Sequence, residues 1–183
     1  MSPQSLLRAV LASVFVVLVT GCASLPSEVP RTESKALTDT GDTRLGHGVR
    51  QMTSAHPGQS GIRALSVANE AFAARILLAR GAQRSLDLQY YIWHRDTTGQ
   101  LLWEEVWRAA ERGVRVRVLI DDANTGGLDP MLATLDAHPN IELRLFNPFA
   151  NRGFRAGDFL SDFTRVNHRM HNKSFTADNQ VAI

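Results

Sequence analysis

An alternation of helix-type and strand-type hydrophobic patterns between residues 61 and 146 constrains the fold of this chain more than any other feature. Apolar residues recur at helical spacing over 68–79 and alternate with polar residues over 86–92. The same order repeats, with helical spacing over 98–110 before alternation over 114–120, and a short helical pattern before alternation over 141–145. Parallel strands need crossover connections of this length. The sequence therefore predicts an α/β domain with a layered, parallel-rich sheet flanked by helices.

Residues known for capping mark the ends of these elements. Gly81 and Gly113 follow the first two helical patterns and are expected to end them. Thr98 is the expected cap of the second helix, and Asp129 is the expected N-cap of the third, with Pro130 at its first position. The segment 170–183 alternates again and predicts a strand, a turn near 178–179 and a further strand.

The segment 147–167 fits no strand, and Phe159, Phe163 and Val166 predict a short helix within it. Phe149, Phe154, Arg152 and Arg155 could form a flap that faces lipid or covers a substrate. Burial of the phenylalanines in the core is an equally good interpretation. The sequence alone leaves both open.

The N-terminus predicts export and lipid attachment. Arg8 precedes an apolar run over 9–19 that is too short for an ordinary membrane-spanning helix. The run leads to Gly21 and to Cys22, the only cysteine, which therefore has no disulfide partner within the chain. This order resembles a bacterial lipobox, which implies a lipoprotein signal peptide over 1–21 and a lipidated Cys22. The resemblance places the protein in the cell envelope, on the periplasmic side of the outer or inner membrane of a Gram-negative bacterium.

The remainder divides into a tether and a domain. Residues 22–60 hold turn signals and no periodic apolar run, so we expect a flexible tether followed by a domain over 61–183. The chain carries 20 basic and 18 acidic residues, a balance that argues against broad coating of nucleic acid. No nucleic-acid partner is expected. The sequence stops at Ile183 within an alternating pattern, and we expect the domain to be incomplete there.

Candidate catalytic residues lie in the segment 168–178. His171 and Lys173 are two apart, so on a strand their side chains would project to the same face. An imidazole beside a permanent cation suits a phosphodiester, because the lysine can bind phosphoryl oxygens while the histidine acts as nucleophile or acid/base. Asp178 has the opposite parity and is expected to support the strand–turn geometry by hydrogen bonds.

These residues spell His-x-Lys-x-x-x-x-Asp, and the chain resembles the phospholipase D superfamily in this motif. Further segments are similar to its bacterial cardiolipin synthase-like branch. They are Ser85–Trp93, Arg112–Val116, Asp121-Asp122, Phe146–Pro148 and Met170–Lys173. The resemblance covers roughly residues 31–183.

The resemblance implies a phosphatidyltransferase or phospholipase D that acts on membrane phospholipids of the phosphatidylglycerol or phosphatidylethanolamine class. It implies a phosphohistidine intermediate, with His171, Lys173 and Asp178 as catalytic residues and no metal or other cofactor. Tyr91, Asn172 and Arg155 are further candidates for substrate binding. Core packing is the competing interpretation for Tyr91 and its aromatic neighbours Tyr90 and Trp93.

The resemblance also implies two such motifs, whose histidines meet between two similar halves. This sequence holds one, because Lys35 is its only other lysine. We therefore expect the chain alone to be inactive until a second half, in a longer chain or a homodimer, completes the site. A phosphodiesterase acting on nucleic acid and a non-catalytic envelope lipoprotein are the competing functions.

Metal sites are weaker alternatives. His168 and His171 have the spacing of two ligands on a helix, but their segment alternates like a strand and offers no acidic ligand nearby. Asp121 and Asp122 at the end of a strand suggest magnesium. In α/β sheets such carboxylates more often cap the next helix or pair with arginine, which is the interpretation we favour.

Overall fold

The computed structural model describes residues 3–6, 25, 28–29 and 32–183 of the chain. Two compact units are present. One contains residues 32–146 and 169–183, and the other contains residues 147–168 with the described part of the N-terminal 31 residues. Apart from residues 3–6, the expected signal peptide lies outside the described residues, as does Cys22. No helix among the described residues combines the length and apolar character needed to span a bilayer.

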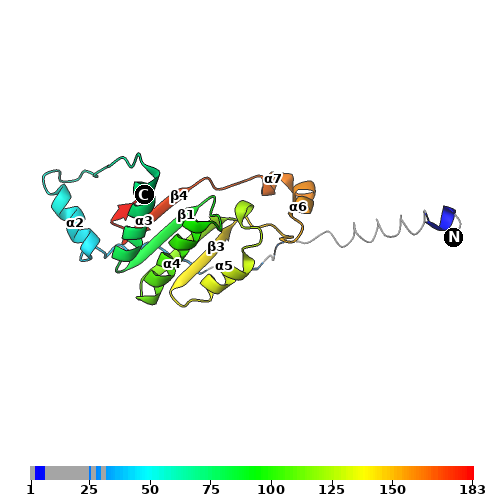
Figure 1. Ribbon diagram of the computed structural model, residues 1–183, viewed down its shortest axis with the longest axis horizontal. Helices are drawn as coiled ribbons and strands as arrows, with labels where there is room; N and C mark the ends of the chain where they lie inside the picture. Colours follow the sequence, from blue (N-terminus) through cyan, green and yellow to red (C-terminus); the bar gives the residue numbers. More distant parts are fainter. Residues whose placement is uncertain (1–2, 7–24, 26–27, 30–31) are drawn as a thin grey trace. The chain divides into compact units, whose positions relative to one another are not determined.

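A five-stranded mixed sheet forms the centre of the larger unit (Figure 1). Its order is β3-β2-β1-β4-β5. β1 pairs with β2, and β2 with β3, in parallel, whereas β4 is antiparallel to both β1 and β5. The strands are β1 (Ser85–Tyr90), β2 (Arg115–Asp121), β3 (Ile141–Phe146), β4 (Lys173–Ala177) and β5 (Val181–Ala182). The predicted α/β class with a parallel-rich sheet is confirmed.

The described residues of the larger unit form four helices, of which the last three lie where the hydrophobic periodicity predicts them. The four are α2 (Arg44–Thr53), α3 (Ala68–Gly81), α4 (Thr97–Glu111) and α5 (Asp129–Asp136), with a single 3-10 turn over Asp122–Asn124. Gly113 follows the end of α4 with a φ of 88°, a left-handed conformation that glycine adopts without strain.

The predicted caps of α4 and α5 were wrong by one or two residues. Asp96, not Thr98, is the N-cap of α4, because its carboxylate accepts the backbone N–H of Gly99 at 2.7 Å. This hydrogen bond lowers the pKa of Asp96. Leu128 occupies the N-cap position of α5, so Asp129 is already the first helical residue and its negative charge faces the positive end of the helix.

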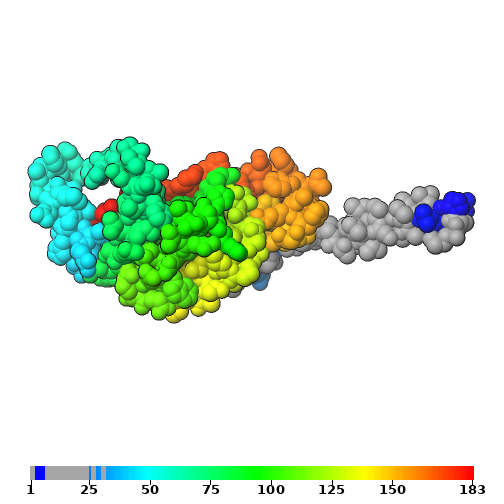
Figure 2. Space-filling model, in the orientation of Figure 1, coloured from blue at the N-terminus to red at the C-terminus, as the bar shows by residue number. Residues whose placement is uncertain are grey.

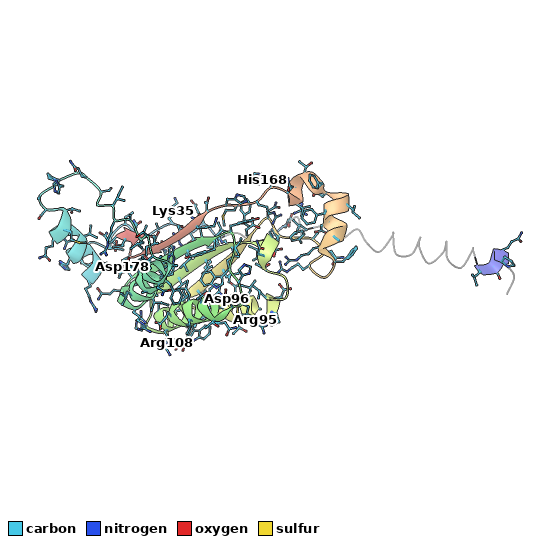
Figure 3. All side chains as sticks on the ribbon, turned by 45° about the horizontal axis from the view of Figure 1, so that its top comes forward. Lys35, Arg95, Asp96, Arg108, His168 and Asp178 are labelled. Carbon is cyan, nitrogen blue, oxygen red and sulfur yellow. The ribbon has the colours of Figure 1, made fainter. Side chains whose placement is uncertain are left out.

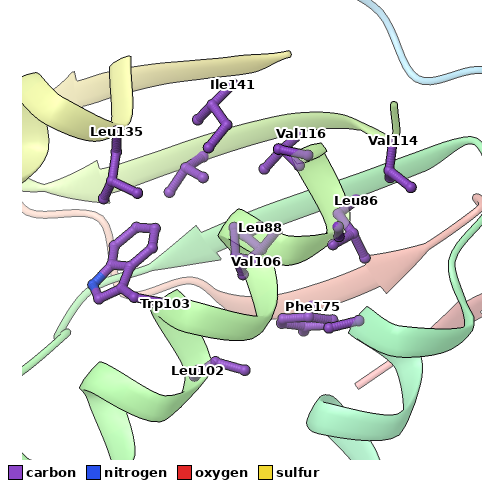
Figure 4. Close-up of a cluster of buried hydrophobic side chains, with 14 of the residues drawn as sticks. Leu86, Leu88, Leu102, Trp103, Val106, Val114, Val116, Leu135, Ile141 and Phe175 are labelled. Carbon is purple, nitrogen blue, oxygen red and sulfur yellow. The ribbon is translucent and has the colours of Figure 1, made fainter. Parts of the chain in front are cut away.

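One face of the sheet carries the hydrophobic core. α3 contacts α4 and β4, α4 contacts β2, and α5 contacts β3. The close-up in Figure 4 shows Val106 and Trp103 of α4 directed towards Leu88 of β1, and Phe175 of β4 closing the same layer. Figure 2 shows, in teal to yellow, the segments that carry α3, α4 and α5 on the face turned to the viewer. The alternating residues of the strands thus bury their apolar side under the helices.

The opposite face of the sheet is polar. Arg117 of β2 pairs with Asp87 of β1 across neighbouring strands. An extended segment crosses this face, where Arg117 Nη1 donates to the hydroxyl of Ser34 at 3.3 Å and Arg115 Nη2 donates to the carbonyl of Lys35 at 2.7 Å. This face therefore holds its covering segment through arginine hydrogen bonds.

The segment expected as a tether contains a helix, which the sequence pattern did not indicate. α2 begins after Thr43, whose hydroxyl accepts the N–H of Gly46 at 3.1 Å. Thr40 is fully buried and its hydroxyl accepts from Gln180 Nε2 at 3.0 Å. Gly46 is the buried residue of this helix, and a Cβ there would lie 2.5 Å from the carbonyl oxygen of Gly41. Leu45 of α2 also packs against the core, and Leu45, Val49 and Met52 recur at helical spacing. This stripe is short and Met52 is 75% exposed, so it is a weak signal in the sequence.

The smaller unit contains the short helix that the phenylalanine spacing predicted, split into α6 (Arg155–Ser161) and α7 (Phe163–Val166). Phe149 is buried, whereas Phe154 and Phe163 are each 60% exposed. Asp158 is buried, and its carboxylate accepts the backbone N–H of Asn151 at 3.2 Å. Of the two interpretations of these phenylalanines, core packing therefore holds for Phe149 and not for Phe154.

We expect Phe175→Ala to destabilise the protein by about 3–5 kcal/mol, because Phe175 is fully buried between the sheet and its helices. Phe163→Ala is the control, since that ring is 60% exposed and its loss should change stability by about 0.5 kcal/mol or less. Urea unfolding followed by circular dichroism measures both. Equal losses in the two variants would contradict the core assigned here.

Candidate active site

The segment 171–173 lies beside the end of β1. The antiparallel register places Lys173 opposite Tyr90, and the pairing continues by one step, because the N–H of Tyr91 donates to the carbonyl of Asn172 at 3.0 Å. β4 begins at Lys173, so the prediction that His171 lies within the strand was wrong. His171 instead directly precedes the strand.

His171 and Lys173 nevertheless share one neighbour. The imidazole of His171 lies against the ring of Tyr91, with the ring centroids 4.3 Å apart. The Nζ of Lys173 lies over the same ring, 5.6 Å from its centroid, and donates to the backbone carbonyl of His171 at 3.4 Å. Both side chains are exposed to solvent. The structure therefore brings an accessible imidazole and an accessible ammonium group to the same phenol ring.

Tyr91 is the candidate whose position the sequence resolved least. Core packing competed with substrate binding there, and the structure places its half-buried ring in contact with both candidate catalytic residues. A ring face attracts a cation through its quadrupole, so the phenol restricts where the ammonium of Lys173 can move. The spacing of Tyr91 from the motif gives no hint of this contact, because the pairing of β1 with β4 creates it.

The other two substrate-binding candidates differ in their surroundings. Asn172 is exposed, and its Nδ2 donates to Oε1 of Gln89 at 2.8 Å. Arg155 is the first residue of α6 in the smaller unit, where its guanidinium lies 4.8 Å from the ring centroid of Phe149. The larger unit thus brings together Tyr91, His171 and Asn172 with Lys173, whereas Arg155 belongs to the other unit.

The side chain of Asp178, labelled in Figure 3, binds the chain at the start of β1. Its fully buried carboxylate accepts three backbone N–H groups, from Gln83 at 3.1 Å, Arg84 at 2.7 Å and Ser85 at 3.0 Å. Asp178 itself has a φ of 51°, which aspartate tolerates better than most residues. These contacts match the supporting role expected from its parity, while its part in catalysis stays a prediction.

An aromatic layer supports the site from below. Tyr90 lies edge-on to Trp93 at a centroid distance of 4.8 Å, and Trp93 stacks on Trp103 at 3.9 Å. Burial raises the pKa of Tyr90, although Nε of Arg75 donates to its hydroxyl at 3.1 Å and opposes the shift. Trp93 is buried in the core, so core packing is the correct interpretation there.

The acidic pair at the end of β2 is engaged by protein groups. Asp121 caps the 3-10 turn by accepting the N–H of Ala123 at 2.8 Å, and it pairs with Arg169. Both behaviours were expected of a strand-end carboxylate. Among the described residues, no group of three or more His, Cys, Asp or Glu side chains is arranged to hold a metal ion.

A family model described as "Cardiolipin synthase, PLD-like domain" matches residues 76–183, a range that contains the whole sheet and the motif of His171, Lys173 and Asp178. The chain belongs to this family. The phospholipase D resemblance of the sequence is thereby confirmed.

Relatives of this cardiolipin synthase-like domain agree. Cardiolipin synthase C of Escherichia coli (strain K12) is 53% identical over 140 residues, which cover 76% of this chain and 30% of that protein. A cardiolipin synthase of Staphylococcus aureus (strain Mu50) is 30% identical over 107 residues, covering 56% of this chain and 19% of that protein. The chain therefore spans less than a third of the length of these two relatives. Among solved structures, NucT from Helicobacter pylori aligns with a TM-score of 0.43 at 20% identity, over 62% of this chain and 64% of that one.

We expect Asp178→Ala to lower the free energy of unfolding by about 3 kcal/mol, because it removes the acceptor of three backbone N–H groups. Asp178→Asn should fall between this variant and the wild type, since asparagine keeps one acceptor oxygen and tolerates the left-handed conformation. Asp42→Ala is the matched control, as its side chain is 76% exposed. Thermal unfolding measures the series, and an Asp178→Ala protein as stable as the control would contradict the role given to this carboxylate.

Proposed function

We propose that this domain forms half of the active site of an enzyme that transfers phosphatidyl groups between membrane phospholipids, as in cardiolipin synthesis. The observation that carries the proposal is the placement of the exposed His171 and Lys173 side chains on one aromatic ring, within a family of cardiolipin synthase-like domains. The name of the Escherichia coli relative, cardiolipin synthase C, supports a phospholipid substrate.

The proposed reaction has two displacements at phosphorus. In the first, an imidazole nitrogen attacks the phosphodiester of the donor lipid, a nitrogen–phosphorus bond forms, and the phosphorus–oxygen bond to the headgroup alcohol breaks. The leaving oxygen takes a proton from a general acid, and the released alcohol departs. In the second, the hydroxyl of an acceptor lipid attacks the phosphohistidine, gives its proton to the same group acting as base, and frees the imidazole. Water as acceptor gives hydrolysis.

The groups of this half-site fit parts of that scheme. The ammonium of Lys173 is positively charged and exposed, so it can bind the non-bridging oxygens and stabilise the negative charge that grows on them. The exposed imidazole of His171 can serve as nucleophile or as acid/base. The other role falls to a second histidine, which we propose comes from a second His-x-Lys-x-x-x-x-Asp half in a longer chain or in a second copy of this one.

The test is the lipid product formed by the protein expressed from its complete reading frame. His171→Ala should abolish cardiolipin in thin-layer chromatography, and Lys173→Ala should reduce its rate by about 10²–10³-fold, the cost of losing a group that stabilises developing charge. His168→Ala is the control, because His168 is exposed and lies outside the motif. Unfolding curves should be unchanged in all three.

Three results would contradict the proposal. Normal cardiolipin output from His171→Ala would remove the catalytic histidine. Degradation of DNA without any lipid product would favour the phosphodiesterase that acts on nucleic acid. A wild-type protein without either activity would favour a non-catalytic envelope protein.

We also propose that the protein is a lipoprotein of the cell envelope, anchored through acyl chains on Cys22 on the periplasmic side of the membrane. The support is the sequence, in which a positive residue, a short apolar run and Gly21-Cys22 follow one another. The anchor would hold the domain near its proposed substrates.

We expect Cys22→Ser to remove metabolic labelling by radioactive palmitate and to leave the precursor uncleaved. Ser27→Ala, five residues downstream, is the control and should be labelled like the wild type. Immunoblots of membrane fractions measure the same change as a shift in mobility. Labelling that persists in Cys22→Ser would rule out this anchor.

A further inference from the structure

The two residues that precede His171 are hydrogen-bonded to a buried carboxylate that has no role in the proposed reaction. Asp121 is the last residue of β2 and is fully buried. Its Oδ2 accepts the backbone N–H of Met170 at 2.8 Å, and its Oδ1 accepts from Arg169 Nη1 at 3.0 Å. The two residues that directly precede His171 are therefore bound to a carboxylate that lies 48 and 49 positions earlier in the sequence.

This anchor matters because His171 lies outside the strand. β4 begins only at Lys173, so the ladder does not hold the backbone of His171. On one side of it the N–H of Met170 is bound to Asp121, and on the other the carbonyl of Asn172 accepts the N–H of Tyr91 at 3.0 Å. The backbone on either side of His171 is thus hydrogen-bonded, and on the N-terminal side the acceptor is the buried carboxylate of Asp121.

We propose that Asp121 is a positioning residue for His171. It fixes the backbone of residues 169–170 so that the imidazole stays against the ring of Tyr91, facing the phosphorus. Asp121 is buried, and it acts on His171 through the backbone N–H of Met170 and the guanidinium of Arg169. The anchor itself is independent of the reaction, whereas its effect on rate rests on the proposed function.

Charge makes this anchor stronger than an ordinary backbone contact. The side chain of Arg169 is 10% exposed and that of Asp121 is fully buried, so their hydrogen bond is shielded from water and charge-assisted. The carboxylate also accepts from Ala123, which ties the same group to the 3-10 turn after β2. Asp121 therefore links the turn after β2 to residues 169 and 170, which directly precede His171.

The experiment compares Asp121→Asn and Asp121→Ala with Asp122→Asn, in protein from the complete reading frame. Asp122 is a good control because it is equally buried and adjacent, while its carboxylate accepts from the hydroxyl of Thr125 instead. Amide hydrogen exchange with mass spectrometry reports whether residues 169–172 stay anchored. The rate of carbethoxylation of His171 reports its exposure, and steady-state kinetics on phosphatidylglycerol vesicles report the consequence.

In Asp121→Ala we expect faster exchange confined to residues 169–172 and faster carbethoxylation of His171. The value of kcat should fall by about 10²-fold, as expected for misplacement of a reacting group, with KM unchanged. Asp121→Asn keeps one acceptor oxygen and should fall between Asp121→Ala and the wild type in exchange and in kcat. Asp122→Asn should leave exchange at 169–172 unchanged.

Two outcomes would overturn the proposal. Unchanged exchange at 169–172 in Asp121→Ala would show that the carboxylate anchors nothing there. Loss of protection across β1 and β2 in the isosteric Asp121→Asn would make Asp121 a residue of the general fold. If the wild type makes no lipid product, the proposed function fails, and the exchange and carbethoxylation data still decide the anchor.

Discussion

The pairing of β4 with β1 is the interaction on which the candidate site depends. β4 is the strand that brings residues from the end of the sequence to the centre of the sheet, and it is fixed at both ends. At one end the carboxylate of Asp178 accepts three N–H groups at the start of β1, and at the other the N–H of Tyr91 donates to Asn172. Phe175 fills the space between. A shift of register by one residue would turn Phe175 to the polar face, so the core itself selects the register that places Lys173 beside Tyr91.

The elements that the sequence predicts correctly are those built on an apolar period. The helices α3 and α4 and the three parallel strands each bury one side, and the spacing of their apolar residues indicates which side that is. α2 carries only a short apolar period, Leu45, Val49 and Met52, and Met52 is 75% exposed, so this helix is weakly marked. The motif gives His171 and Lys173 as a pair, but the contact of both with Tyr91 arises from the pairing of β4 with β1, which a single sequence does not contain. The contacts behind the role proposed for Asp121 could not be predicted for the same reason, since its partners lie 48 and 49 residues away in the sequence.

In the larger unit, buried carboxylates hold the backbone, and the candidate catalytic side chains are exposed. Its three fully buried carboxylates, Asp121, Asp122 and Asp178, all accept hydrogen bonds from neighbouring protein groups. Burying a carboxylate is costly unless such bonds replace its water, and these bonds in turn hold distant segments together. The two groups assigned to chemistry, His171 and Lys173, remain exposed. Buried acids therefore hold the backbone, while the imidazole and the ammonium group stay accessible to a ligand.

An exposed half-site has a chemical consequence. In the proposed reaction one imidazole cannot attack phosphorus and protonate the leaving alcohol in the same step, so a second acid would have to approach from the solvent side of His171. The group that supplies this acid would also decide whether the proposed reaction ends in transfer to a lipid or in hydrolysis. Transfer to a lipid hydroxyl requires that water be kept from the phosphohistidine, and the exposed groups of this unit do not exclude water by themselves. Whatever supplies the second acid must also cover the first histidine, so we infer that completing the site and excluding water are one event.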